Sequence, residues 1–240
     1  MEKRNFRPTF TLPFVCLTVL FVVCLIVSNL IEIKTVSLGF ITVTAGLAVF
    51  PVSYIINDCI VEVYGFRRAR FVIWLGFGMS LLVALLLNMA ISLPGSADWQ
   101  GQEALETVYG AVPRIMAASF AAFICGSMVN AWVMSRLKRS APSDSVNSWS
   151  RFSLRAIVST LFGEGVDSLI FFPVAFGGVL PWSTVLQLII AQMLLKTAYE
   201  IIILPVTIRV VRALKRIEGI DTVDSAATDY SCLLYTSPSP

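Results

Sequence analysis

The sequence predicts an all-α integral membrane protein with six transmembrane helices and both termini in the cytoplasm. Apolar residues make up 57% of the 240-residue chain and charged residues only 14%, against about 45–50% and about 25% in soluble domains. A water-soluble protein of this length buries too little of its surface to hide that apolar content. The distribution of Lys and Arg along the chain is the third observation that indicates this class.

Six apolar segments are each near the roughly 20 residues that cross a bilayer core. The first is too long for a signal peptide and lacks a small-residue cleavage site, so we interpret it as a retained helix. The last is long enough to tilt or to extend into the cytoplasm. In chain order the expected spans run approximately over Leu12–Asn29, Ile41–Tyr64, Phe71–Leu93, Arg114–Leu137, Ser153–Phe176 and Trp182–Val211.

Lys and Arg alternate between the connections of these spans. Most of the 18 cations lie before span one, between spans two and three, around the connection of spans four and five, and after span six. The opposite connections hold only Lys34 and Arg114, and the longest of them, residues 94–113, carries acidic residues. Because cationic connections stay in the cytoplasm, both termini are expected there. A count of five or seven spans would break the alternation.

The chain is expected to have three parts. Residues 1–11 form a cytoplasmic N-terminal tail, and residues 12–216 form the six-helix membrane domain. A Ser-rich cytoplasmic linker at 140–150 separates its two three-helix halves. Residues 217–240 lose the apolar pattern, so we expect a disordered or non-native tail.

Several function classes are excluded by what the chain lacks. It contains no histidine, which removes His-ligated metal sites, Ser-His catalysis and HExxH proteases. Its five Cys form no CxxC pair, and its net charge of +3 is too weak to indicate nucleic-acid binding. We therefore expect no metal, no cofactor, no catalytic residue and no nucleic-acid partner.

Charged side chains nevertheless stand inside the predicted spans, where each costs roughly 2.5–3.5 kcal/mol even on a lenient insertion scale. Their depth places Lys196 and Asp167 near mid-bilayer, where a lysine needs carboxylate partners. Three pairs are spaced three or four residues apart, and each therefore shares one helix face: Asp58 with Glu62, Glu164 with Asp167, and Lys196 with Glu200.

Structural explanations remain open for several of these residues. Glu62 is close to arginines such as Arg67, so it fits an interfacial charge pair. Lys196 fits a structural tether to Asp167 or to Glu200. Amides in the spans fit interhelical hydrogen bonds as well as ligands.

The carboxylates of the fifth span are the hardest to explain by packing alone. Gly163 and Gly165 flank Glu164, and glycines let another helix or a ligand approach the backbone. Polar groups from most spans facing one interior are typical of a transporter site. Many acceptors around one cation suit a neutral or cationic solute with several N–H groups. A guanine-like base fits, because its ring N–H and its amino group form a donor pair for a carboxylate.

Four ordered segments also carry a family resemblance. The first is Ser28-Asn29, and the second comprises Phe50-Pro51, Asp58, Glu62–Gly65 and Ala69-Arg70; the third comprises Arg155–Gly163, Asp167 and Phe171-Phe172, and the fourth Lys196, Tyr199-Glu200, Pro205 and Thr207. Together they resemble the queuosine precursor transporter family, also called the putative vitamin uptake transporters. The resemblance covers most of residues 12–216.

The resemblance implies a six-helix inner-membrane protein similar to the substrate-binding subunits of energy-coupling-factor vitamin transporters. It implies uptake of 7-cyano-7-deazaguanine or its aminomethyl relative for tRNA modification. The matching positions that it marks as functional are Asn29, Asp58, Glu62, Arg155, Asp167, Lys196 and Glu200.

The expected site places the base in mid-membrane. In this hypothesis the base stacks on Phe50, Phe171 or Phe172, and its N1–H and amino group donate to Glu164 or Asp167. The opposite edge of the base meets Asn29 or Gln192. Lys196 keeps the carboxylates ionised, and Asp58 or Glu200 carries a coupling proton. Glu62, Arg67 and Arg155 are expected to be structural or interfacial charges. Lipid and a homo-oligomeric partner are further expected contacts.

Three alternatives come from other classes. A subunit of an energy-coupling-factor importer would need an ATPase partner, which docks through small residues that are scarce in the first span. An intramembrane enzyme would have to use a carboxylate pair such as Glu164 and Asp167, without an accompanying cleavage motif. A channel would need rings of like charge from an oligomer.

Overall fold

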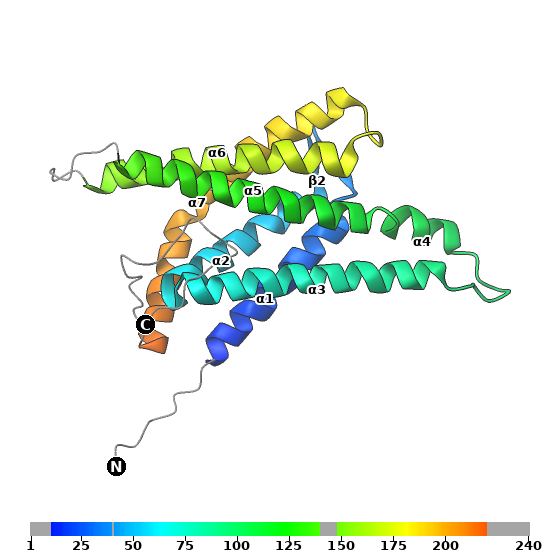
Figure 1. Cartoon of the computed structure of the whole chain (residues 1–240), viewed down its shortest axis with the longest axis horizontal. Coiled ribbons are helices and arrows are strands. Elements are labelled where there is room, and N and C mark those ends of the chain that lie inside the picture. The colour runs from blue at the N-terminus through cyan, green and yellow to red at the C-terminus, as the bar shows by residue number, and fades with distance from the viewer. Residues whose placement is uncertain (1–10, 40, 140–147, 220–240) are drawn as a thin grey trace, which may run out of the picture.

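The computed structural model describes residues 11–39, 41–139 and 148–219. Over these ranges the chain is mainly helical (Figure 1). In chain order the elements are α1 (Leu12–Ile31), β1 (Thr35–Leu38), β2 (Ile41–Thr44), the 3₁₀ helix η1 (Ala45–Ala48), α2 (Phe50–Tyr64), α3 (Phe66–Ser92), α4 (Gln102–Tyr109), α5 (Val112–Arg139), α6 (Ser148–Phe176) and α7 (Trp182–Glu218).

Five helical segments are long and apolar enough to cross a membrane, which confirms the helical membrane class. They are Leu12–Ile31, Arg68–Ser92, Gln102–Asn130, Ile157–Phe176 and Trp182–Ile203. The predicted second span is missing from this set.

The prediction of one continuous span over Ile41–Tyr64 is wrong in its first part. Residues 41–44 form strand β2, which pairs antiparallel with β1, and α2 begins only at Phe50, with Pro51 in its first turn. β-branched residues favour a strand, and Gly39, at φ 67°, supplies the left-handed conformation that a tight hairpin turn requires. The 15 residues of α2 extend about 22 Å, less than the roughly 30 Å of a bilayer core.

Other boundaries also differ from the expected ones. The predicted outer loop at 94–113 contains the short exposed helix α4 and the start of α5. Helix α7 continues to Glu218, beyond the expected end of the sixth span at Val211. Most of the predicted tails at 1–11 and 217–240 and of the linker at 140–150 lies outside the described residues.

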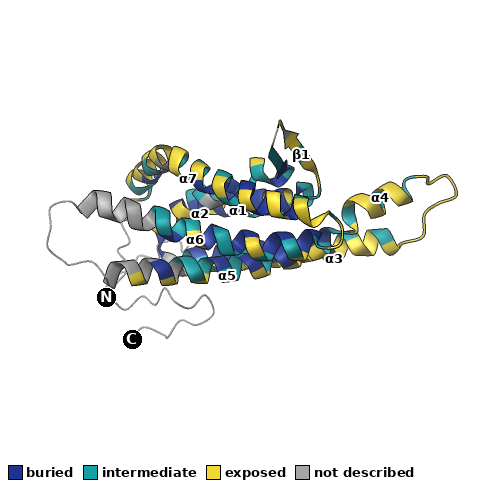
Figure 2. Ribbon diagram, turned by 90° about the horizontal axis from the view of Figure 1, so that it is seen from above, coloured by how far each residue is buried: buried dark blue, intermediate teal, exposed yellow. Residues whose placement is uncertain are grey.

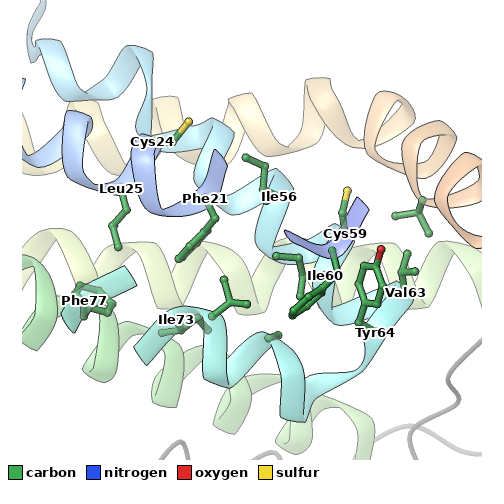
Figure 3. Close-up of a cluster of buried hydrophobic side chains, with 14 residues drawn as sticks. Phe21, Cys24, Leu25, Ile56, Cys59, Ile60, Val63, Tyr64, Ile73 and Phe77 are labelled. Atoms are coloured by element: carbon green, nitrogen blue, oxygen red, sulfur yellow. The ribbon is translucent and has the colours of Figure 1, made fainter. Parts of the chain in front are cut away.

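The helices pack in two groups. In the first group α1, α2 and α3 share a buried apolar cluster, and Figure 3 shows Phe21 and Leu25 of α1 pointing toward α3, which carries Ile73 and Phe77. In the second group α5, α6 and α7 share a cluster centred on Phe172 and Leu188. Helices α5 and α6 lie side by side in both views (Figures 1 and 2).

Exposed residues line the outward faces of the bundle (Figure 2), and many of them are large and apolar. Leu81 and Leu85 on α3 are 60% exposed, and Ile202 on α7 is 74% exposed. Contiguous exposed apolar surface of this kind requires a cover, and the hydrocarbon of a membrane fits the lengths of these helices.

One end of the bundle is fastened by Glu218, near the end of α7. Its Oε1 accepts hydrogen bonds from Thr11 Oγ1 at 2.7 Å and from Tyr64 OH at 2.9 Å. The start of α1, the end of α2 and the end of α7 therefore meet, and the described chain begins and ends at the same end of the bundle.

Helices α5 and α6 approach most closely where two glycines face each other. A Cβ added to Gly126 would lie 2.9 Å from the carbonyl oxygen of Gly163, and one added to Gly163 would lie 2.8 Å from Cβ of Asn130. The contact is backbone to backbone, as small residues permit in membrane helices. It confirms the prediction that a helix approaches Gly163.

We predict that Gly163→Ala lowers the stability of the protein by about 1–3 kcal/mol, because the added methyl group forces α5 and α6 apart. Thermal unfolding of the purified protein in detergent measures the effect. The matched control is Gly78→Ala on α3, where a Cβ meets nothing within 4 Å. Equal unfolding temperatures for the two variants would contradict the packing role of Gly163.

Candidate functional site

A pocket lies between the two groups of helices, and the empty space in and around it is about 350 Å³, open solvent included. Helices α1, α2, α5, α6 and α7 all contribute to its wall, together with η1. Its polar lining is Asn29, Glu32, Ser119, Asp167, Gln192 and Lys196. Its apolar lining is Leu47, Phe50, Phe171 and Phe172.

Lys196 occupies the centre of the charged part of this pocket. Its Nζ lies 2.9 Å from Asp167 Oδ2 and 3.3 Å from Glu164 Oε2. All three residues are at least nine-tenths buried. The expected pairing of the mid-span lysine with carboxylates is therefore confirmed, and the pairing offsets the desolvation of each charge.

The two carboxylates have different positions relative to the pocket. Both lie on one face of α6 because they are three residues apart. Asp167 lines the pocket, whereas Glu164 contacts Lys196 from outside the lining. Asp167 is therefore the better placed of the two to meet a solute.

Lys196 also contacts the aromatic part of the pocket. Its Nζ lies 4.6 Å from the centroid of the Phe50 ring, within the range of a cation–π interaction. Phe171 and Phe172 stand edge to face with ring centroids 5.0 Å apart. Flat apolar walls and charged groups are thus available to the same occupant.

A chain of hydrogen bonds enters the pocket from the hairpin. Gln192 Nε2 donates to Thr44 Oγ1 at 2.5 Å, and Thr44 Oγ1 donates to Glu32 Oε1 at 2.6 Å. Glu32, Thr44 and Gln192 are 7%, 1% and 1% exposed. Asn29, one turn before Glu32, donates from Nδ2 to the carbonyl oxygen of Leu25.

Sequence reasoning missed four of these positions: Glu32, Thr44, Leu47 and Ser119. The apolar pattern places Glu32 in a connection and Thr44 in a span, because it does not distinguish the hairpin from a helix. The spacing of Asn29 and Glu32, three residues apart at the end of an apolar helix, is the signal that points to a shared face.

Other predicted residues lie away from the pocket. Asp58 is exposed on α2, and Glu200 is half-buried on α7 outside the pocket lining. Glu62 forms an ion pair with Lys215 of α7, at 2.7 Å. The side chains of Arg67 and Arg155 lie outside the described residues.

Within residues 11–39, 41–139 and 148–219, no group of three or more Cys, Asp or Glu is arranged to hold a metal ion. The chemistry that the pocket offers is hydrogen bonding, ion pairing and aromatic contact.

Comparison with known proteins adds the following. The family model described as "Putative vitamin uptake transporter" matches residues 44–210. The "Probable queuosine precursor transporter" of Bacillus subtilis is 34% identical, over 74% of this chain and 76% of the relative. The "Queuosine precursor transporter" of Escherichia coli is 33% identical over 61% of each chain. A Haemophilus influenzae protein with the same printed name as the Bacillus relative is 29% identical, over 55% of this chain and 52% of its own length. No solved structure matches the chain.

We predict that Lys196→Met destabilises the protein by about 3–5 kcal/mol, because it leaves Asp167 and Glu164 buried without a cation. Lys215→Met is the matched control on the same helix. The side chain of its partner Glu62 is 61% exposed. The loss of stability caused by Lys215→Met should therefore stay within about 1 kcal/mol. Thermal unfolding in detergent compares the two variants, and similar losses would show that the buried pairs do not stabilise the fold.

Proposed function

The chain belongs to the putative vitamin uptake transporter family, and from this premise we propose that it imports a queuosine precursor for tRNA modification. The solute would be 7-cyano-7-deazaguanine or 7-aminomethyl-7-deazaguanine. The observation that carries the proposal is the similarity to relatives named as queuosine precursor transporters. The matched range, residues 44–210, includes Phe50, Asp167, Gln192 and Lys196 of the pocket.

The chemistry of the pocket supports a deazapurine as the occupant. Asp167 would accept hydrogen bonds from the ring N1–H and the 2-amino group, which form a donor pair. Asn29 donates one Nδ2–H within α1, so its amide oxygen and its second N–H are left to address the base. Phe50, Phe171 and Phe172 offer faces and edges to a flat ring.

The proposed topology has six crossings with both termini in the cytoplasm of an inner membrane. The hairpin, η1 and α2 together would make the second crossing, with α2 as its helical part. Two observations support this arrangement: α1 begins at the end of the bundle where α7 ends, and the Lys- and Arg-rich connections would share that side.

Transport against a gradient needs a coupling group, and we propose Asp58 and Glu200 for it. Helices α2 and α7, which carry Asp58 and Glu200, pack against each other. Both residues lie outside the pocket lining, where proton exchange would not require the solute to leave.

We predict that Asp167→Asn abolishes uptake while the protein still inserts in the membrane. The loss follows because an amide replaces one acceptor oxygen with a donor, which repels the N–H groups of the base. Queuosine in tRNA is measured in bacteria that make no precursor and lack their own importer, fed a low concentration of 7-cyano-7-deazaguanine.

The matched control is Asp98→Asn, in the exposed connection after α3, which should restore queuosine as the unchanged chain does. Membrane fractions are blotted to show equal amounts of each variant. Full queuosine with Asp167→Asn would remove this residue from the site. No queuosine with the unchanged chain would reject the proposed solute.

A further inference from the structure

The hydrogen-bond chain Glu32–Thr44–Gln192 joins the hairpin to the pocket, and the proposed function assigns it no role. It connects the end of α1, the end of β2 and the middle of α7. Residues so far apart in the sequence meet here with almost no exposure to solvent. Buried polar networks of this kind fix the orientation of their members.

The direction of each hydrogen bond follows from the number of protons available. When Glu32 is ionised its carboxylate can only accept, so in that state the single proton of the Thr44 hydroxyl is used for Glu32. The hydroxyl oxygen can then only accept from Gln192. The amide must therefore turn its NH₂ group to Thr44, which leaves its carbonyl oxygen as the free end.

That carbonyl oxygen is a buried acceptor awaiting a donor. No donor among the described residues reaches Gln192 Oε1, although Gln192 lines the pocket and is 1% exposed. An unsatisfied buried acceptor costs free energy that a bound N–H group can recover. Without Thr44 the amide could turn over and present its NH₂ group, which would repel the same donor.

The position of Glu32 is fixed by backbone as well as by Thr44. Gly46 in η1 lies against it so closely that an added Cβ would overlap the Glu32 carboxylate. Thr44, Gly46 and Leu47 belong to one short stretch, so the segment that holds Glu32 also supplies part of the pocket wall.

We propose that Glu32 is a positioning residue that acts through Thr44 to hold the Gln192 carbonyl oxygen toward the pocket, where it accepts a hydrogen bond from an N–H of the bound base. This inference rests on the proposed function and deepens it. Glu32 itself lines the pocket, so direct contact with the solute is the competing explanation, and a double-mutant cycle separates the two.

Binding of 7-cyano-7-deazaguanine to the purified full-length chain in lipid nanodiscs is measured by calorimetry. The isosteric Thr44→Val removes only the hydroxyl, and we expect it to weaken binding about tenfold, as Gln192→Leu does. Thr44→Ser keeps the hydroxyl and should recover most of the affinity. Thr42→Val, the same substitution two residues earlier in β2, is the control and should bind as the unchanged chain does.

The decisive comparison pairs Glu32→Leu with Gln192→Leu. If Glu32 acts through the amide, the double variant binds no more weakly than Gln192→Leu alone. Glu32→Gln keeps an acceptor for Thr44 and should lose far less than Glu32→Leu. Thermal unfolding confirms that each variant is folded. If Glu32→Leu does not fold, Thr44→Val takes its place in the comparison with Gln192→Leu.

Two outcomes overturn the inference and are distinguishable. In the first, the unchanged chain binds the base, and the affinity losses of the two single variants multiply in the double variant. Glu32 and Gln192 would then act independently, and the proposed function would stand. No binding by the unchanged chain would overturn the proposed function, and the role of Glu32 with it.

Discussion

Burial of one lysine in the middle of a membrane protein is the constraint on which the rest of this structure depends. The Lys196 ammonium is stable there only because Asp167 and Glu164 lie within 3.3 Å of it. Those carboxylates reach it because α6 packs between α5 and α7, and α6 meets α5 through two glycines. The ion cluster, the close helix contact and the pocket beside them are thus parts of one arrangement.

The sequence was most informative at polar and charged residues, whose burial in a membrane has a high free-energy cost. Lys196, Asp167, Gln192 and Asn29 were predicted for one interior because polar groups inside apolar spans need a reason, and the structure brings all four to the pocket. The five membrane-capable helices follow from the same energetic argument.

Periodicity was a weaker guide to the segment before α2. A short apolar run of β-branched residues fits a strand and a helix equally well, so Ile41–Thr44 was assigned to a span. The pairing of β2 with β1 depends on contacts across the turn, which local composition does not specify. Glu32 and Thr44 were missed for that reason, since their importance appears only when the hairpin folds against α7.

Helix α7 is anchored at two distant points, by the ion cluster at Lys196 and by the hydrogen bonds of Glu218. Pro205 stands between them inside the helix. A proline has no N–H to donate to the preceding turn, so it is the natural hinge of a helix. The backbone hydrogen bond that Pro205 cannot donate is therefore missing between the two anchors, so α7 resists bending less there than a helix without proline would.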